Sequence, residues 1–120
     1  MIKPDRNLRD RTKQFALCII RLFMSLPKSI EATVIGKQVL RSGTSIGANY
    51  REAYRSRSKA EFTAKMGDCL KELEETAYWL ELLVESGIAD QQTHAAVRKE
   101  CEELTAIFVT IIKKSREDKQ

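Results

Sequence analysis

The sequence predicts an all-α protein that folds as an antiparallel up-down-up-down four-helix bundle. Apolar residues recur at steps of three and four along four segments, and no segment alternates apolar and polar residues as a strand would. Three short breaks, around a proline, a serine-rich turn and a glycine, separate these segments. Because consecutive helices with short connections pack most simply as antiparallel neighbours, we expect all 120 residues to form a single domain.

The first two helices are expected at 5–26 and 29–54. Pro27 ends the first helix, because proline cannot continue one. Ser29 suits the N-cap of the second helix, and Glu31 in its first turn interacts favourably with the positive end of the helix dipole. The apolar face of the first helix consists of Leu8, Phe15, Cys18, Ile19, Leu22 and Phe23.

The last two helices are expected at 58–86 and 90–115. Ser58 and Glu61 have the spacing of a capping box, and Gly87 lies where a helix C-cap belongs. The apolar positions are Phe62, Met66, Cys69, Leu73, Ala77, Leu80 and Val84 in the third helix and Val97, Cys101, Leu104, Phe108 and Ile111 in the fourth. Three cations suit the C-terminal end of the fourth helix, namely Lys113, Lys114 and Arg116.

The composition indicates a folded domain with a mild positive charge. Hydrophobic residues make up 42% and charged residues 32% of the chain, and the net charge is +4. These values exclude a disordered chain and one embedded in a membrane. The charged first residues lack the apolar stretch of a secretory signal, and the longest apolar run ends at Arg21, far short of the roughly 20 residues that span a bilayer. We expect a cytoplasmic protein with no membrane partner.

The three cysteines, Cys18, Cys69 and Cys101, lie far apart within apolar periodic segments. No two of them form the closely spaced pairs typical of zinc or redox sites. We expect reduced thiols buried in the core, where cysteine packs as a small hydrophobic residue. No cofactor and no metal site are expected.

The second helix is unusual, because glycine, serine and asparagine are concentrated in its middle although they are weak helix formers. At 100° per residue these residues separate into stripes. The glycine stripe allows close approach of a neighbouring helix. The polar stripe needs hydrogen-bond partners if it is buried, and it serves either a structural network or contact with a ligand or nucleic acid. The polar stripe is Gln38, Ser42, Ser45, Asn49 and Glu52; the apolar stripe is Ile35, Val39, Ile46, Tyr50 and Ala53; the glycine stripe is Gly36, Gly43 and Gly47; the basic side is Lys37, Arg41, Arg51 and Arg55.

We expect the polar stripe to be at least partly buried against the third helix. The candidate partners there are Glu72, Lys71 and Tyr78, which would face Arg41, Ser45 and Asn49.

The stretch RSGTSIGANYREA resembles the signature of the four-helix-bundle proteins encoded within bacterial 23S ribosomal RNA intervening sequences, also labelled S23 ribosomal protein. The segment KELEETAYWLELL resembles the third helix of that family, with Glu72 at its recurrent acidic position. The chain departs from the usual family pattern at Tyr50 and Arg51, where many members have small residues. The matching motif residues are Arg41, Ser42, Ser45, Ile46, Asn49 and Glu52.

This resemblance implies a homopentamer of four-helix protomers around a central channel. It also implies likeness to the accessory subunit of diversity-generating retroelements, a basic pentamer that binds nucleic acid and a reverse transcriptase. Self-association, RNA or DNA, and a reverse transcriptase are therefore the expected partners.

The positive charges, together with the family resemblance, favour nucleic-acid binding as the leading function. A basic stripe supplies affinity that does not depend on base sequence, and a pentamer would multiply a weak patch by avidity. The stretch 72–103 is acidic, so the charge is distributed unevenly. The candidate contacts are Arg6, Arg9, Arg11, Lys13, Lys37, Arg41, Arg51, Arg55, Arg57 and Lys59.

Two other classes of function are open at this stage. A protein–protein scaffold would use the small-residue stripe and the adjacent aromatics Tyr78 and Trp79. A magnesium-dependent nucleotide hydrolase would use two carboxylate pairs on facing helices. His94 is expected at the surface, and a di-iron site is excluded because it needs more than one histidine. The carboxylate pairs are Glu72 with Glu75 and Glu100 with Glu103. We expect no enzyme activity.

Overall fold

The computed structural model describes residues 4–117, and the side chains of residues 8–92 and 94–117. Within this part the chain forms four long helices and no strand. Their bounds confirm the expected ones to within one or two residues. The helices are α1 (Pro4–Ser25), α2 (Ile30–Tyr54), α3 (Lys59–Glu85) and α4 (Gln91–Glu117).

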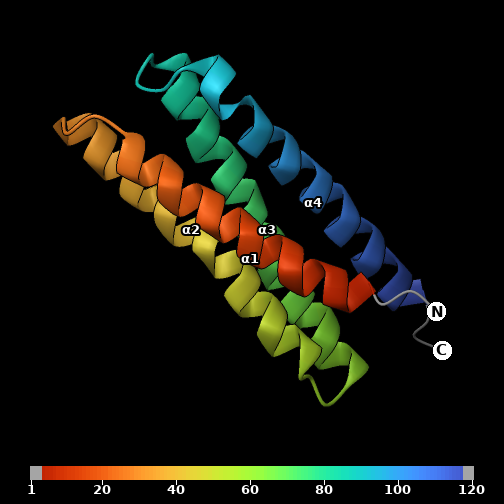
Figure 1. Ribbon diagram of the computed structural model, residues 1–120. Coiled ribbons are helices and arrows are strands. Elements are labelled where there is room, and N and C mark those ends of the chain that lie inside the picture. The colour runs from red at the N-terminus through yellow and green to blue at the C-terminus, as the bar shows by residue number, and fades with distance from the viewer. Residues whose placement is uncertain (1–3, 118–120) are drawn as a thin grey trace.

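The four helices run alternately up and down in a slender bundle, which measures 51 × 23 × 20 Å. In Figure 1, α1 lies over α2, α3 runs beside α2, and α4 completes the bundle beside α3. The α2–α3 turn lies at the same end as the first turns of α1 and the last turns of α4. The all-α antiparallel bundle predicted from the sequence is therefore the observed fold.

Local capping explains where α2 and α3 begin. The Ser29 hydroxyl accepts a hydrogen bond from the Ala32 amide at 3.2 Å, and the Ser58 hydroxyl accepts one from the Glu61 amide at 3.0 Å. The Glu61 carboxylate accepts a bond from the backbone amide of Arg57, one residue before the N-cap. These bonds satisfy amides that a helix start leaves unpaired. Gly87 lies just after the last turn of α3 and has a φ of 84°, a left-handed backbone conformation that favours glycine.

The glycine stripe of α2 packs directly on α1, as expected. Gly43 faces Ile19, and a Cβ built on Gly43 would lie 2.8 Å from Ile19 Cγ1. Gly36 and Gly47 make similar approaches further along the same pair of helices. The glycines thus allow α1 and α2 to pack more closely than side chains would permit.

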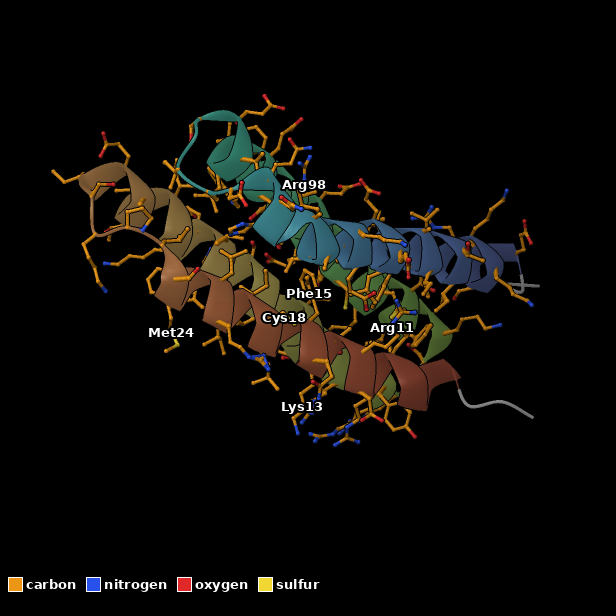
Figure 2. All side chains as sticks on the ribbon, turned by 45° about the horizontal axis from the view of Figure 1, so that its top comes forward. Arg11, Lys13, Phe15, Cys18, Met24 and Arg98 are labelled. Atoms are coloured by element: carbon orange, nitrogen blue, oxygen red, sulfur yellow. The ribbon has the colours of Figure 1, made fainter. Side chains whose placement is uncertain are left out.

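The structure corrects two predictions about burial. Cys18 is exposed, because it lies on the edge of α1 towards α4 (Figure 2), where these helices make few contacts. His94 is buried, with 5% of its surface exposed, and its Nδ1 lies 2.9 Å from the Asp90 carbonyl oxygen. Cys69 and Cys101 are buried as expected, and burial raises the pKa of each thiol to about 12.

The register of the α3 apolar face differs from the prediction by one position at two places. Thr76 and Leu83 are buried, whereas Ala77 is exposed and Val84 is half-buried. None of the helices between residues 4 and 117 is long and apolar enough to cross a membrane.

Candidate functional site

The polar stripe of α2 is buried along the edge that faces α3. Ser42 has no exposed surface, and its Oγ lies 2.8 Å from Thr76 Oγ1. Thr76 Oγ1 also lies 2.8 Å from the Glu72 carbonyl oxygen. The buried hydroxyls therefore satisfy one another across the α2–α3 interface, which supports a structural role for this part of the stripe.

The rest of the stripe is less buried, and within the described residues only Ser45 and Glu52 make side-chain hydrogen bonds. The Ser45 hydroxyl donates to the Arg41 carbonyl oxygen at 2.6 Å, and Gln38 and Asn49 are half-buried with no hydrogen bond from their side chains within the described residues. Glu52 is exposed and pairs with Lys65 at 2.8 Å. The exposure of the stripe thus ranges from the fully buried Ser42 to the exposed Glu52.

Arg41 links the family motif to α3. Its guanidinium contacts the carboxylates of Glu72, at 3.4 Å, and Glu75. The hydrogen bond to Glu75 raises the pKa of Arg41 above its ordinary value. The expected partnership with Glu72 is confirmed, whereas Lys71 and Tyr78 are exposed and make no hydrogen bond to the stripe within the described part of the chain.

Arg11 likewise bridges two helices, α1 and α4, on the other side of the bundle. Figure 2 shows it pointing from α1 towards α4, where it contacts Glu100 at 2.6 Å and Glu103 at 3.1 Å. The hydrogen bond to Glu100 raises the pKa of Arg11. Arg11 thus already has two carboxylate partners, and its predicted contact with nucleic acid stays a prediction.

The two carboxylate pairs proposed for a magnesium site lie on opposite sides of the bundle. Glu72 and Glu75 face Arg41 of α2, whereas Glu100 and Glu103 face Arg11 of α1. Residues 8–92 and 94–117 contain no group of three or more His, Cys, Asp or Glu side chains placed to hold a metal ion. The structure therefore does not bring the two carboxylate pairs together, as the hydrolase alternative would require.

Other predicted cations gather on the surface formed by the outward sides of α1 and α2, which we call the α1–α2 outer face. Thr12 packs against Gly47, so the first half of α1 lies beside the second half of α2. Arg9 and Lys13 therefore lie at the same end of the bundle as Arg51 and Arg55. Figure 2 shows Lys13 pointing away from the bundle with other nitrogen-bearing side chains around it.

These four cations are exposed and form no ion pair with any described residue. Asp10 lies on the same part of α1, while the neighbouring carboxylate of Glu52 is bound by Lys65. Lys37 is also exposed but lies nearer the other end of α2, and the side chain of Arg6 lies outside the described residues. At this end of the bundle, the outer face therefore carries a basic patch formed by Arg9, Lys13, Arg51 and Arg55.

The other end of the outer face is apolar. Met24 is 71% exposed and Ile30 is 80% exposed, and Leu17, Ile20 and Val34 are also exposed. Figure 2 shows Met24 directed away from the bundle. Exposed apolar clusters of this kind are typical of surfaces that bind another protein.

The structure adds cations that the sequence pattern did not assign to binding. Lys114, at the end of α4, lines a pocket together with Arg57 and Lys59 of the α2–α3 turn. Lys113 and Arg116 line the adjoining groove between α3 and α4. No sequence pattern signals this cluster, because residues 57 and 114 meet only when α4 packs on α3.

Comparison with known proteins gives two findings. The family described as 23S rRNA-intervening sequence protein matches residues 5–110. Among solved structures, the chain is similar to a protein of unknown function from the S23 ribosomal protein family of Bacteroides thetaiotaomicron, with 38% sequence identity and a TM-score of 0.86. The similarity covers 92% of this chain and 99% of that chain. None of the curated proteins compared with this chain matches it.

Proposed function

The chain belongs to the 23S rRNA-intervening sequence protein family, and from this premise we propose that it is a non-enzymatic, oligomeric accessory protein that binds RNA or DNA. The observation that carries the proposal is the basic patch of the α1–α2 outer face, where four exposed cations have no carboxylate partner in the described residues. Unpaired cations at a surface are available to displace counterions from a phosphate backbone. The cations of the patch are Arg9, Lys13, Arg51 and Arg55.

Salt dependence tests this proposal. Fluorescence anisotropy measures the affinity for single-stranded RNA, single-stranded DNA and duplexes between about 50 and 200 mM salt. We expect affinity to fall steeply with salt, by about 0.7 in logarithmic slope for each single-strand phosphate neutralised. Affinity that does not change with salt, or no binding at the lowest salt, would remove nucleic acid as the ligand.

Paired variants then locate the contact. The double variant Lys13→Gln/Arg51→Gln removes two cations of the patch, and Lys71→Gln/Lys99→Gln removes the same charge from exposed positions on α3 and α4. We expect the first to lower the salt slope by about 1.4 for each engaged protomer, and the second to leave it nearly unchanged. Equal effects of the two variants would show that net charge, not the patch, controls binding.

We further propose that the protein assembles as a homopentamer through the apolar end of the outer face. The exposed side chains of Met24 and Ile30 support self-association. When this face meets a different face of the next protomer, the interface is heterologous and can close into a ring.

Light scattering tests the assembly, with an expected mass of five times the 13.7 kDa chain. Met24→Glu and Met24→Lys should both dissociate the ring, because each places a charge in an apolar contact. Both should also weaken nucleic-acid binding through lost avidity, even though Met24→Lys adds a favourable charge. An undisturbed mass for both variants would place the interface elsewhere.

A protein–protein scaffold, such as an accessory subunit of a reverse transcriptase, is the second candidate. The observation that favours it is the exposed Tyr78, whose ring packs edge-on against Trp79 with centroids 5.1 Å apart. Aromatic side chains are enriched at protein interfaces. An oligomer that binds a reverse transcriptase and shows no salt-dependent nucleic-acid binding would favour this role.

A further inference from the structure

The α2–α3 turn and the last turns of α4 border an open surface pocket of about 550 Å³. This volume lies within the range of small-molecule sites. Thr63 of α3 and Ser115 of α4 are hydrogen-bonded at 2.6 Å and hold the two helices together at its edge. The residues that line the pocket are Ser56, Arg57, Ser58, Lys59, Phe62, Ile111, Lys114 and Ser115.

The lining is cationic on one side and apolar on the other. Arg57, Lys59 and Lys114 supply three positive charges, and no described residue of the lining carries a carboxylate. The nearby Glu61 carboxylate accepts a hydrogen bond from the backbone amide of Arg57. This bond does not involve the Arg57 guanidinium. Phe62 contributes the apolar floor together with Ile111 of α4.

A buried polar atom in the lining lacks a partner. The hydroxyl oxygen of Ser56 is buried, and no described residue hydrogen-bonds to it. Buried hydroxyls are nearly always hydrogen-bonded, so an unpaired one needs an explanation. Ser56 is one of the lining residues, and because this oxygen is closed off from solvent, a ligand oxygen would supply the missing bond only after the side chain turns towards the pocket.

A groove continues from the pocket along α3 and α4. A second hollow of about 430 Å³ shares Lys59 and Ser115 with the pocket and adds Arg116. The cations thus follow a path along the helices and are not confined to a single point. Such a path fits a chain of phosphates better than an isolated anion.

We propose that this pocket binds one nucleotide of a single-stranded nucleic acid. The phosphate contacts Arg57 and Lys114, because charge-assisted hydrogen bonds from such groups suit phosphate oxygens. The base or sugar lies on the floor formed by Phe62 and Ile111, and the groove carries the neighbouring phosphate past Arg116. The inference rests on the proposed nucleic-acid function and adds a preference for unpaired strands, because a duplex keeps its bases inside and offers only its backbone.

Binding measurements with matched variants test the pocket. Arg57→Gln/Lys114→Gln removes two lining cations, and Lys28→Gln/Lys99→Gln removes the same charge from exposed positions away from the pocket. The probe is a short single-stranded RNA, compared with the duplex of the same sequence. We expect the pocket variant to bind the single strand about ten-fold more weakly at low salt and to lower the salt slope by about 1.4, while the control changes affinity less than about three-fold.

A third variant tests the floor. Phe62→Leu keeps an apolar side chain but removes the aromatic ring, and we expect about a five-fold or greater loss for the single strand, with little change for the duplex. Thermal unfolding of each variant shows whether the fold is kept. Amide resonances of residues 56–59 should shift when the wild-type protein is titrated with the same strand.

Each other outcome overturns the inference. If the pocket and control variants lose the same affinity, or if single strand and duplex weaken by the same factor, the pocket does not hold a nucleotide although the proposed function stands. Amide shifts confined to the α1–α2 outer face would likewise show that the strand does not enter the pocket. If the wild-type protein binds no nucleic acid at low salt, the proposed function and this inference fail together.

Discussion

Two mid-helix glycines, Gly43 in α2 and Gly67 in α3, allow a direct test of the close packing between α1 and α2. The same substitution, glycine to alanine, should have opposite effects at the two positions. In both cases alanine improves helix propensity by about 1 kcal/mol. At Gly67 the new methyl group meets no atom within 4 Å, so the gain is expected in full.

At Gly43 the methyl group meets a tight contact. It would lie 2.8 Å from Cγ1 and 2.9 Å from Cγ2 of Ile19, on a buried residue with no exposed surface. These atoms belong to a branched side chain packed in the core, so α1 must move or Ile19 must leave its preferred rotamer. Overpacking of this kind costs about 1–3 kcal/mol, which cancels or exceeds the propensity gain. We expect Gly43→Ala to be destabilising by about 1 kcal/mol net, and Gly67→Ala to be stabilising by about the same amount.

Urea unfolding measures both changes at one fixed protein concentration, because the proposed self-association would make stability depend on concentration. The difference of about 2 kcal/mol between the variants corresponds to a separation of several degrees in melting temperature. If Gly43→Ala is as stabilising as Gly67→Ala, the α1–α2 contact is loose and the glycine stripe needs another explanation. A loss of cooperativity in Gly43→Ala would instead show that the contact holds α1 in the bundle.

Three further results are expected. Ser42→Ala should destabilise the protein by about 1 kcal/mol in urea unfolding, because it removes a buried hydroxyl partner at the α2–α3 interface; an unchanged midpoint would show that the pair is energetically silent. Asn49→Leu should change the free energy of unfolding by less than about 0.5 kcal/mol, because this half-buried side chain has no hydrogen bond within the described residues; a large loss would show that Asn49 has a partner outside those residues. Native labelling with a thiol reagent at pH 8 should modify Cys18 alone, since burial raises the pKa of Cys69 and Cys101 to about 12. Because these pKa values exceed the 9.0 of a free thiol, the associated stability is complete below pH 9 and is lost as the pH rises towards 12; rapid native labelling of all three would contradict the burial.

The helices were predictable because their signals are local. Ser29 and Ser58 cap helices through residues three positions away, and Gly87 ends α3 through its own backbone angle. Such interactions involve only a few consecutive residues, so they can be recognised in the sequence. The pairing of Arg41 with Glu72 was also accessible, because α2 and α3 are consecutive and antiparallel.

The predictions that failed depend on contacts between distant parts of the chain. Periodicity places Cys18 on the inner half of α1, but it does not reveal that α4 makes few contacts there. His94 looks like a surface residue until the start of α4 is folded against the bundle. The pairing of Arg11 with Glu100, 89 residues away, likewise becomes visible only when α1 and α4 are placed together. Sequence spacing gives the face of each residue, and only the tertiary packing shows what covers that face.

The up-down-up-down topology brings four segments that carry cations to the same end of the bundle. In an up-down-up-down arrangement the start of α1, the end of α2, the start of α3 and the end of α4 all lie together, and each of these segments carries exposed cations. A hollow further along α3 and α4 is lined by Glu74, Glu81 and Glu102 together with Arg98. In a ring of protomers with parallel bundle axes, the basic ends would form one continuous rim. The patch of the α1–α2 outer face and the pocket at the α2–α3 turn would then belong to the same rim, so a single strand could engage both. Weak contacts on each protomer would combine through the effective concentration of their neighbours.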